Sequence, residues 1–258
     1  MSAPVLETRD LTIRFGGHVA VDGVSCAFHS GTLTAIVGPN GAGKTTYFNI
    51  MSGQLPASSG SVLLDGEDIT RVGVSGRAQL GIGRAFQITN LFPHLTVHEN
   101  VRLAVQAKSG HAANLWTRWS SHTAWIERAE HYLEEVNLAG QRNALAASLS
   151  HGGKRRLEVA IMMALEPHVF MFDEPTAGMS VDEVPVILDL IHRLKGHGDK
   201  TILLVEHKMD VVRSLADRIV VLHNGRLVAD GDPAAVIASP AVQEAYLGRP
   251  AGKAAAHG

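Results

Sequence analysis

Short runs of apolar residues mark strands along this chain of 258 residues. Some runs alternate with polar residues, as in a half-buried strand, whereas others are wholly apolar, which is typical of a buried parallel strand. The second run is interrupted at Asp22-Gly23, where a break is expected, and an Asn224-Gly225 turn predicts a hairpin between the last two. The predicted strands are 6–15, 19–28, 33–37, 169–172, 201–205, 219–222 and 226–229.

Between about residues 90 and 148 the pattern changes to a helical period. Helices are predicted at 97–108, after Pro93 and Thr96, and at 123–137, where apolar residues fall on one face. A further helix contains Leu157 and ends before Pro167. Asp232 followed by Pro233 is typical of a helix start. We therefore expect a helical subdomain inserted between groups of strands.

Composition and charge limit the classes of function. The formal net charge is −2, and a protein that binds nucleic acid mainly by neutralising phosphates is normally basic. Cys26 is the single cysteine, which excludes a disulfide framework within the chain. Charged residues interrupt the N-terminus early, and no apolar run approaches the roughly 18 residues that span a bilayer. We expect a chain that is soluble and cytosolic on its own, with any membrane role supplied by a partner.

The strand at 33–37 leads directly into a P-loop, which runs from Gly38 to Thr46. The loop fits Gly-x4-Gly-Lys-Thr, and a helix to about Ser52 follows, which is the context that confirms this motif. Its backbone N–H groups must converge on phosphate oxygens, and glycines permit that conformation. Lys44 is expected to neutralise the β and γ phosphates, and Thr45 to place its hydroxyl on Mg²⁺. The residues predicted to bind Mg-ATP are Gly38, Pro39, Asn40, Gly41, Ala42, Gly43, Lys44, Thr45 and Thr46.

A second acidic site follows the apolar strand at 169–172. Parallel strands present their carboxyl ends to one crevice, so Asp173 is expected to meet the P-loop there. Asp173 would hold Mg²⁺, mostly through water, and Glu174 would polarise the attacking water. The alternative is a polar strand end that only caps the next turn.

A second phosphate-binding segment begins the helix that contains Leu157. Ser150 and the glycines Gly152 and Gly153 combine a helix start with backbone N–H groups that can face an anion. One nucleotide does not need two such segments from one molecule. We therefore expect dimerisation around ATP, in which each segment serves the neighbouring subunit.

With these motifs in place, the chain resembles an ABC-type ATPase to about Gly248. Leu149-Ser150-His151-Gly152-Gly153 is similar to the family signature, Gln87 matches the Q-loop and His207 matches the switch histidine. The resemblance implies that Gln87 contacts Mg²⁺ and the attacking water and links to the membrane partner. It also implies that His207 contacts the γ-phosphate and that Phe15 stacks on adenine. A core aromatic is the alternative for Phe15.

The fold implied by the resemblance is α/β: a P-loop NTPase of the ABC nucleotide-binding type, with a mostly parallel sheet and an antiparallel β subdomain. The domain would span 1–248, with the helical subdomain inserted at about 90–156 and a disordered tail at 249–258. The chain departs from the family at three positions. His151 replaces a glycine, Gly153 replaces a glutamine, and Ser180 stands where aspartate is frequent.

Finer features are similar to the ATP-binding subunits of bacterial branched-chain (hydrophobic) amino-acid importers. These features are 86–93, the His-Gly form of the signature, 173–179 and 245–248. The resemblance implies a second ATP-binding subunit in an ATP-sandwich dimer, two transmembrane permeases and, indirectly, a periplasmic binding protein. The chain would lie at the cytoplasmic face of the inner membrane. Relatives that move urea, short-chain amides or lipopolysaccharide share these features, so the transported substrate stays open.

Two other classes of P-loop protein are alternatives to a transport motor. A non-transport ABC ATPase usually has coiled-coil arms, zinc modules or two cassettes in one chain, and a small-metabolite P-loop kinase needs neither Ser150 nor His207. The tryptophans of the helical insert, Trp116, Trp119 and Trp125, lie beside arginines, which favours an interface. One hypothesis places 115–125 near the permease-docking groove, and the alternative is an aromatic mini-core.

Overall fold

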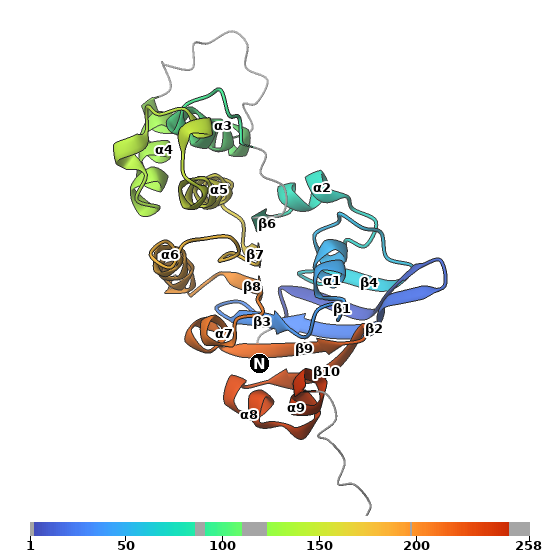
Figure 1. Cartoon of the computed structure of the whole chain (residues 1–258). Helices are drawn as coiled ribbons and strands as arrows, with labels where there is room; N and C mark the ends of the chain where they lie inside the picture. Colours follow the sequence, from blue (N-terminus) through green and yellow to red (C-terminus); the bar gives the residue numbers. More distant parts are fainter. Residues whose placement is uncertain (1–2, 86–90, 110–122, 197, 248–258) are drawn as a thin grey trace, which may run out of the picture. The chain divides into compact units, whose positions relative to one another are not determined.

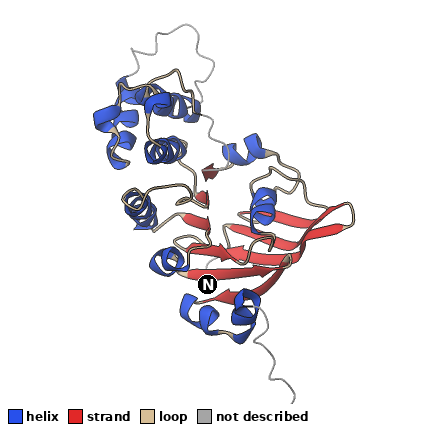
Figure 2. Ribbon diagram, in the orientation of Figure 1, coloured by secondary structure: helices blue, strands red, loops and turns tan. Residues whose placement is uncertain are grey.

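The structure is a computed structural model that describes residues 3–85, 91–109, 123–196 and 198–247. The chain divides into two compact units, which are described separately. The terminal unit comprises Met1–Gly73 and Leu203–Gly258, and the central unit comprises Val74–Ile202. The border falls inside strand β8 (Thr201–Val205). Both units combine helices with strands (Figure 2), so the α/β class predicted from the sequence is confirmed.

An antiparallel sheet occupies the N-terminal part of the terminal unit. Its strand order is β2 (His18–Phe28), β1 (Leu6–Phe15), β4 (Ser59–Leu64) and β5 (Glu67–Asp68). Phe15 pairs with His18 across the tight turn at Gly16-Gly17. The break expected at Asp22-Gly23 was wrong, because β2 continues through it. Shifts in the register between β1 and β2 absorb the irregularity instead.

A second group of strands in the terminal unit forms its core. β3 (Leu33–Val37) lies parallel to β9 (Arg218–His223), which pairs antiparallel with β10 (Arg226–Gly231). All five residues of β3 are buried, as its mainly apolar run predicted. The helices of this unit are α1 (Lys44–Met51), α7 (Met209–Leu215), α8 (Pro233–Ala238) and α9 (Pro240–Leu247) (Figure 1). The core cluster that joins strands and helices contains Ala35, Val37, Val212, Ile219, Val221, Val236 and Val242.

The central unit has a helical part and a strand part. Helices α3 (Val97–Lys108), α4 (Thr123–Glu135) and α5 (His151–Ala164) pack against one another. β6 (Ile82–Ala85) lies parallel to β7 (Val169–Asp173). Its other helices are α2 (Val74–Gln79) and α6 (Val184–Gly196), with single 3₁₀ turns at Ala139–Gln141 and Ala146–Ser148. No helix among the described residues is long and apolar enough to cross a membrane.

The structure tests the predicted end of the helix at 123–137 and the predicted role of Trp125. The helix expected at 123–137 ends at Glu135, and Asn137 has a φ of 55°, which no helix continues through. Trp125 is buried in α4, on the face that also buries Ala129 and Leu133. This position agrees with the mini-core alternative for Trp125, whereas Trp116 and Trp119 lie outside the described residues.

A capping box fixes the start of α3. The Thr96 hydroxyl accepts from the Glu99 backbone N–H at 3.1 Å, and the Glu99 carboxylate accepts from the Thr96 backbone N–H at 2.8 Å. The Thr96 hydroxyl also donates to Glu99 at 2.8 Å. The backbone N–H of Thr96, followed by its hydroxyl, lowers the pKa of Glu99 below the ordinary value of 4.5.

Thr96→Ala should therefore lower the free energy of unfolding by about 1 kcal/mol, because the Glu99 backbone N–H loses its acceptor and the Glu99 carboxylate loses the hydroxyl donor. Ser75→Ala, at an exposed position in α2, is the control and should change it by less than about 0.5 kcal/mol. Urea denaturation measures both. The pKa of Glu99 is lowered on folding, so the ionised carboxylate stabilises the folded state. The difference in free energy of unfolding between the natural chain and Thr96→Ala should therefore be complete above pH 4.5 and decline as the pH falls through the lowered pKa. Equal effects of both variants at neutral pH would contradict the capping role.

Candidate functional site

The P-loop connects β3 to α1 in the terminal unit, and its glycines are required by close backbone contacts. Gly38 has a φ of 152° and Gly43 a φ of 94°. A Cβ added at Gly38 would lie 2.1 Å from the Leu222 carbonyl oxygen, and one added at Gly43 would lie 2.4 Å from the Ala20 carbonyl oxygen. No side chain larger than hydrogen fits at either position without displacing the backbone of β9 or β2.

The loop is also tied to the turn between β9 and β10. The Gly225 backbone N–H donates to the Ala42 carbonyl at 3.0 Å, and the Asp22 backbone N–H donates to the Gly225 carbonyl at 2.8 Å. Gly225 therefore joins β2 and the P-loop through its two backbone groups. The shape of the loop depends on segments that are far apart in the sequence.

Lys44 and the start of α1 give the P-loop its positive charge. The Lys44 side chain is 7% exposed, and its Nζ donates to the carbonyl oxygens of Gly38 at 2.7 Å and Pro39 at 3.0 Å. The helix begins after Gly43, where no side chain caps the first N–H groups. The positive end of a helix and a buried ammonium group next to it are what a phosphate group requires. Thr45, in the first turn, is exposed and offers a hydroxyl oxygen of the kind that Mg²⁺ prefers.

Two other predicted residues lie in the terminal unit. Phe15, at the end of β1, is 48% exposed, which contradicts the core-aromatic alternative and leaves its ring free to contact a planar ligand. His207 follows β8, and its side chain is about half exposed. The buried Glu206 carboxylate accepts from the His207 backbone N–H at 3.1 Å and lies 3.7 Å from its Nδ1. Glu206 is thus placed to orient the imidazole.

The acidic pair is in the central unit, at the end of β7. The Asp173 carboxylate accepts a hydrogen bond from Arg84 of the neighbouring strand β6 at 2.8 Å, and these side chains are only 9% and 8% exposed. Glu174 has a φ of 48°, a strained conformation for a residue with a side chain. The turn holds it there, because the Ala177 N–H donates to the Glu174 carbonyl at 3.0 Å. Strain of this kind is frequent at functional sites. The Asp173 carboxylate is an oxygen donor suited to Mg²⁺.

The signature segment begins α5 in the central unit. Ser150 is the N-cap residue, and its Oγ accepts from the Gly153 backbone N–H at 3.0 Å. Gly152 and Gly153 are buried in the first turn, whereas Ser150 is exposed. The helix start predicted from the sequence is therefore present. Gln87 lies outside the described residues.

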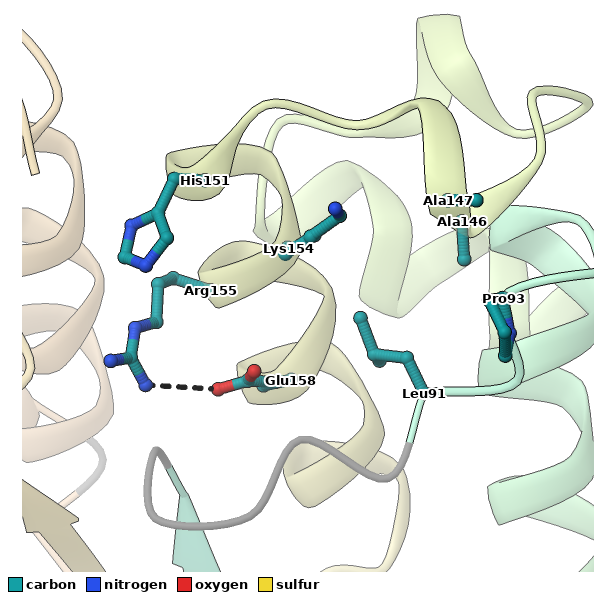
Figure 3. A pocket seen from close by; sticks show the side chains of 8 residues that line it. All are labelled: Leu91, Pro93, Ala146, Ala147, His151, Lys154, Arg155 and Glu158. Atoms are coloured by element: carbon teal, nitrogen blue, oxygen red, sulfur yellow. Dashed lines mark hydrogen bonds and ion pairs between the residues drawn. The ribbon is translucent and has the colours of Figure 1, made fainter. Parts of the chain in front are cut away.

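A cavity of about 430 Å³ opens beside the signature segment within the central unit (Figure 3). One part of its lining is apolar and the other is charged, with Arg155 and Glu158 forming an ion pair at 3.4 Å. The lining residues are Leu91, Pro93, Ala146, Ala147, His151, Lys154, Arg155 and Glu158.

Comparison with known proteins assigns the family. The model of the ABC transporter family matches residues 21–177, and that of the branched-chain amino acid ATP-binding cassette transporter matches residues 226–252. The chain is 40% identical over 96% of its length, and 99% of the relative, to the high-affinity branched-chain amino acid transport ATP-binding protein BraF of Pseudomonas aeruginosa. It is 37% identical to the corresponding LivG protein of Escherichia coli, over 96% of this chain and 99% of that protein. A solved nucleotide-free ATP-binding cassette from an ABC transporter superposes with a TM-score of 0.80 at 29% identity, covering 95% of this chain and 99% of that one.

The chain belongs to the ABC transporter family, as an ATP-binding cassette. The resemblance and the fold predicted from the sequence are thereby confirmed. Its class of activity is that of the transport ATPases.

Three side chains next to the predicted residues were not assigned a role from the sequence. Arg84 binds Asp173, Glu206 contacts His207, and Glu183 contacts Ser150. For Arg84 the sequence carries no signal, because strand 82–85 was itself not predicted. Glu206 stood directly beside a predicted residue. For Glu183 the sequence carries no signal, because its contact joins segments 33 residues apart.

Arg84→Met should lower the free energy of unfolding by about 3–5 kcal/mol, since it leaves the Asp173 carboxylate buried without its cationic partner. The matched control is Arg142→Met, which removes the exposed pair with Glu130 and should cost less than about 1 kcal/mol. Urea denaturation monitored by circular dichroism measures both. A similar decrease in the free energy of unfolding for both variants would show that the buried ion pair stabilises the fold no more than the exposed one.

Gly43→Ala should abolish nucleotide binding, because its methyl group would displace the Ala20 carbonyl and open the P-loop. The control is Gly17→Ala, at a position where an added Cβ meets nothing within 4 Å. Isothermal titration with Mg-ATP measures binding, and thermal unfolding reports whether each variant is folded. A folded Gly43→Ala protein that binds Mg-ATP as well as the natural chain would disprove this account of the loop.

Proposed function

We propose that the chain hydrolyses Mg-ATP to power an importer of branched-chain amino acids. The observation that carries the proposal is the P-loop, in which the buried ammonium group of Lys44 lies among the carbonyls of a loop that ends at an uncapped helix start. The names of the relatives BraF and LivG support the substrate class. Substrate choice itself belongs to the permeases and the binding protein.

Each predicted residue has a role in this proposal. Lys44 and the N–H groups of 38–46 hold the phosphates, and the exposed ring of Phe15 stacks on the adenine. Mg²⁺, when bound, offsets phosphate charge, and the oxygens of Thr45, Asp173 and Gln87 are its expected partners. Glu174 accepts a proton from the attacking water, and His207, oriented by Glu206, donates to the γ-phosphate. The turn after β7 fixes the backbone from which the Glu174 side chain extends.

The partners follow from the chemistry of the signature segment. Ser150, Gly152 and Gly153 form a second anion site, so we infer an ATP-sandwich dimer with a second ATP-binding subunit. Two transmembrane permeases carry the substrate, and a periplasmic binding protein delivers it. The cassette lies at the cytoplasmic face of the inner membrane, attached through the permeases. The cavity beside the signature segment, with its mixed lining, is a suitable surface for such a contact.

Glu174→Gln should retain Mg-ATP binding and lower the rate of hydrolysis by about 10²–10⁴-fold, because the general base is lost. It should also trap a nucleotide-bound dimer. Lys44→Ala should instead weaken ATP binding by about tenfold or more, because a charge-assisted contact to phosphate is removed. Glu127→Gln, an exposed carboxylate of α4, is the control for charge.

Phosphate release, equilibrium binding and sedimentation velocity measure these effects. Normal hydrolysis by Glu174→Gln would refute its assignment as the general base. Unchanged Mg-ATP binding by Lys44→Ala would refute the assignment of the P-loop as the nucleotide site. Isolation of the tagged chain from membranes, with its companions identified by mass spectrometry, tests the transport role. The expected companions are two permeases and a second ATP-binding subunit.

A further inference from the structure

A carboxylate occupies the open end of α5. Glu183 lies just before α6, and its Oε1 is 3.2 Å from the Ser150 Oγ, while its Oε2 accepts from the Ser180 backbone N–H at 3.3 Å. A Cβ added at Gly152 would lie 2.3 Å from the same Oε1. The carboxylate therefore rests directly against the glycine in the first turn of the helix.

The contacts are those that a bound anion makes. The Ser180 backbone N–H is the main cause that lowers the pKa of Glu183 below its ordinary value of 4.5, and Ser150 and the Gly152 N–H act in the same direction. A carboxylate oxygen and a phosphate oxygen are interchangeable as acceptors at a helix N-terminus. Since Gly152 has no Cβ, the space above its backbone is open to either one.

We propose that Glu183 competes with the phosphate of ATP for the signature segment. Ser150 and Gly152 belong to the second anion site proposed above for the ATP-sandwich dimer, where they would face the ATP phosphates held by the second subunit, so this inference rests on the proposed function. The carboxylate and the phosphate cannot both contact them. Glu183 has to leave before the dimer closes, and it thereby raises the ATP concentration that closure requires. By joining Ser150 to Ser180, the carboxylate also links the signature segment to the turn after β7.

The test measures steady-state ATP hydrolysis by the chain in its native complex, isolated from membranes through a tag on the chain. Glu183→Gln and Glu183→Ala should each lower the KM for ATP by about two- to fivefold, the weight of one charge at a helix start. The kcat should stay unchanged, since Glu183 has left the site when hydrolysis occurs. Asp182→Asn, the adjacent exposed carboxylate, is the matched control and should keep the natural KM.

A KM that is unchanged or raised in both Glu183 variants would overturn the proposal. Circular dichroism and thermal unfolding report whether they fold. Should they not fold, Glu183→Asp is the second variant. Its shorter side chain cannot span Ser150 and Ser180 together, and it should lower the KM to an intermediate value.

A second measurement is independent of ATP turnover. In the isolated natural chain, the amide resonances of Gly152 and Ser180 should shift with pH as the Glu183 carboxylate titrates, and the shift should vanish in Glu183→Gln. Resonances of the natural chain that do not respond would overturn the contact itself. The proposed function is tested separately. It fails if the natural complex does not hydrolyse ATP, or if Lys44→Ala leaves hydrolysis intact. If Lys44→Ala abolishes hydrolysis but the Glu183 variants leave the KM unchanged, only the proposal that Glu183 competes with phosphate is refuted.

Discussion

The N-terminus of a helix carries partial positive charge, and the candidate site depends on how that charge is met at two helices. Helix α1 begins after Gly43 without a side-chain cap, whereas α5 begins with the hydroxyl of Ser150 and the carboxylate of Glu183. The two helix starts therefore differ in the group that faces their backbone N–H groups. One helix start is prepared for a ligand by the absence of a cap, and the other holds an acceptor from its own chain.

In each unit a predicted site residue has a buried partner of opposite or complementary polarity. Asp173 is paired with Arg84 on the adjacent strand of the central unit, and in the terminal unit His207 lies against the buried carboxylate of Glu206. A buried charge without a partner is costly, so each contact restricts the side chains that make it. The turn after β7 holds the Glu174 backbone in a strained conformation, which is frequent at functional sites.

Elements of the fold could be predicted from the sequence where the pattern of a short segment determines its structure. The runs 33–37 and 201–205 are apolar except for one threonine each, which predicts burial, and they form strands with those bounds. Residues 59–64 and 82–85 were not predicted, because their serines, glycines and arginine conceal the strand pattern and only pairing with a neighbour makes them strands. The glycine-rich motifs were recognised because their spacing is visible in the sequence, although distant segments complete the shape of the P-loop. Arg84 and Glu183 act across loops, so their contacts exist only once the chain has folded.

The P-loop has a further consequence for the order in which the chain can fold. Its backbone packs against Ala20 of β2 on one side and against Leu222 and Gly225 of the β9–β10 hairpin on the other, and the Gly225 N–H donates to the Ala42 carbonyl. The loop is synthesised well before that hairpin, so it reaches its final shape only when the two distant segments have folded together.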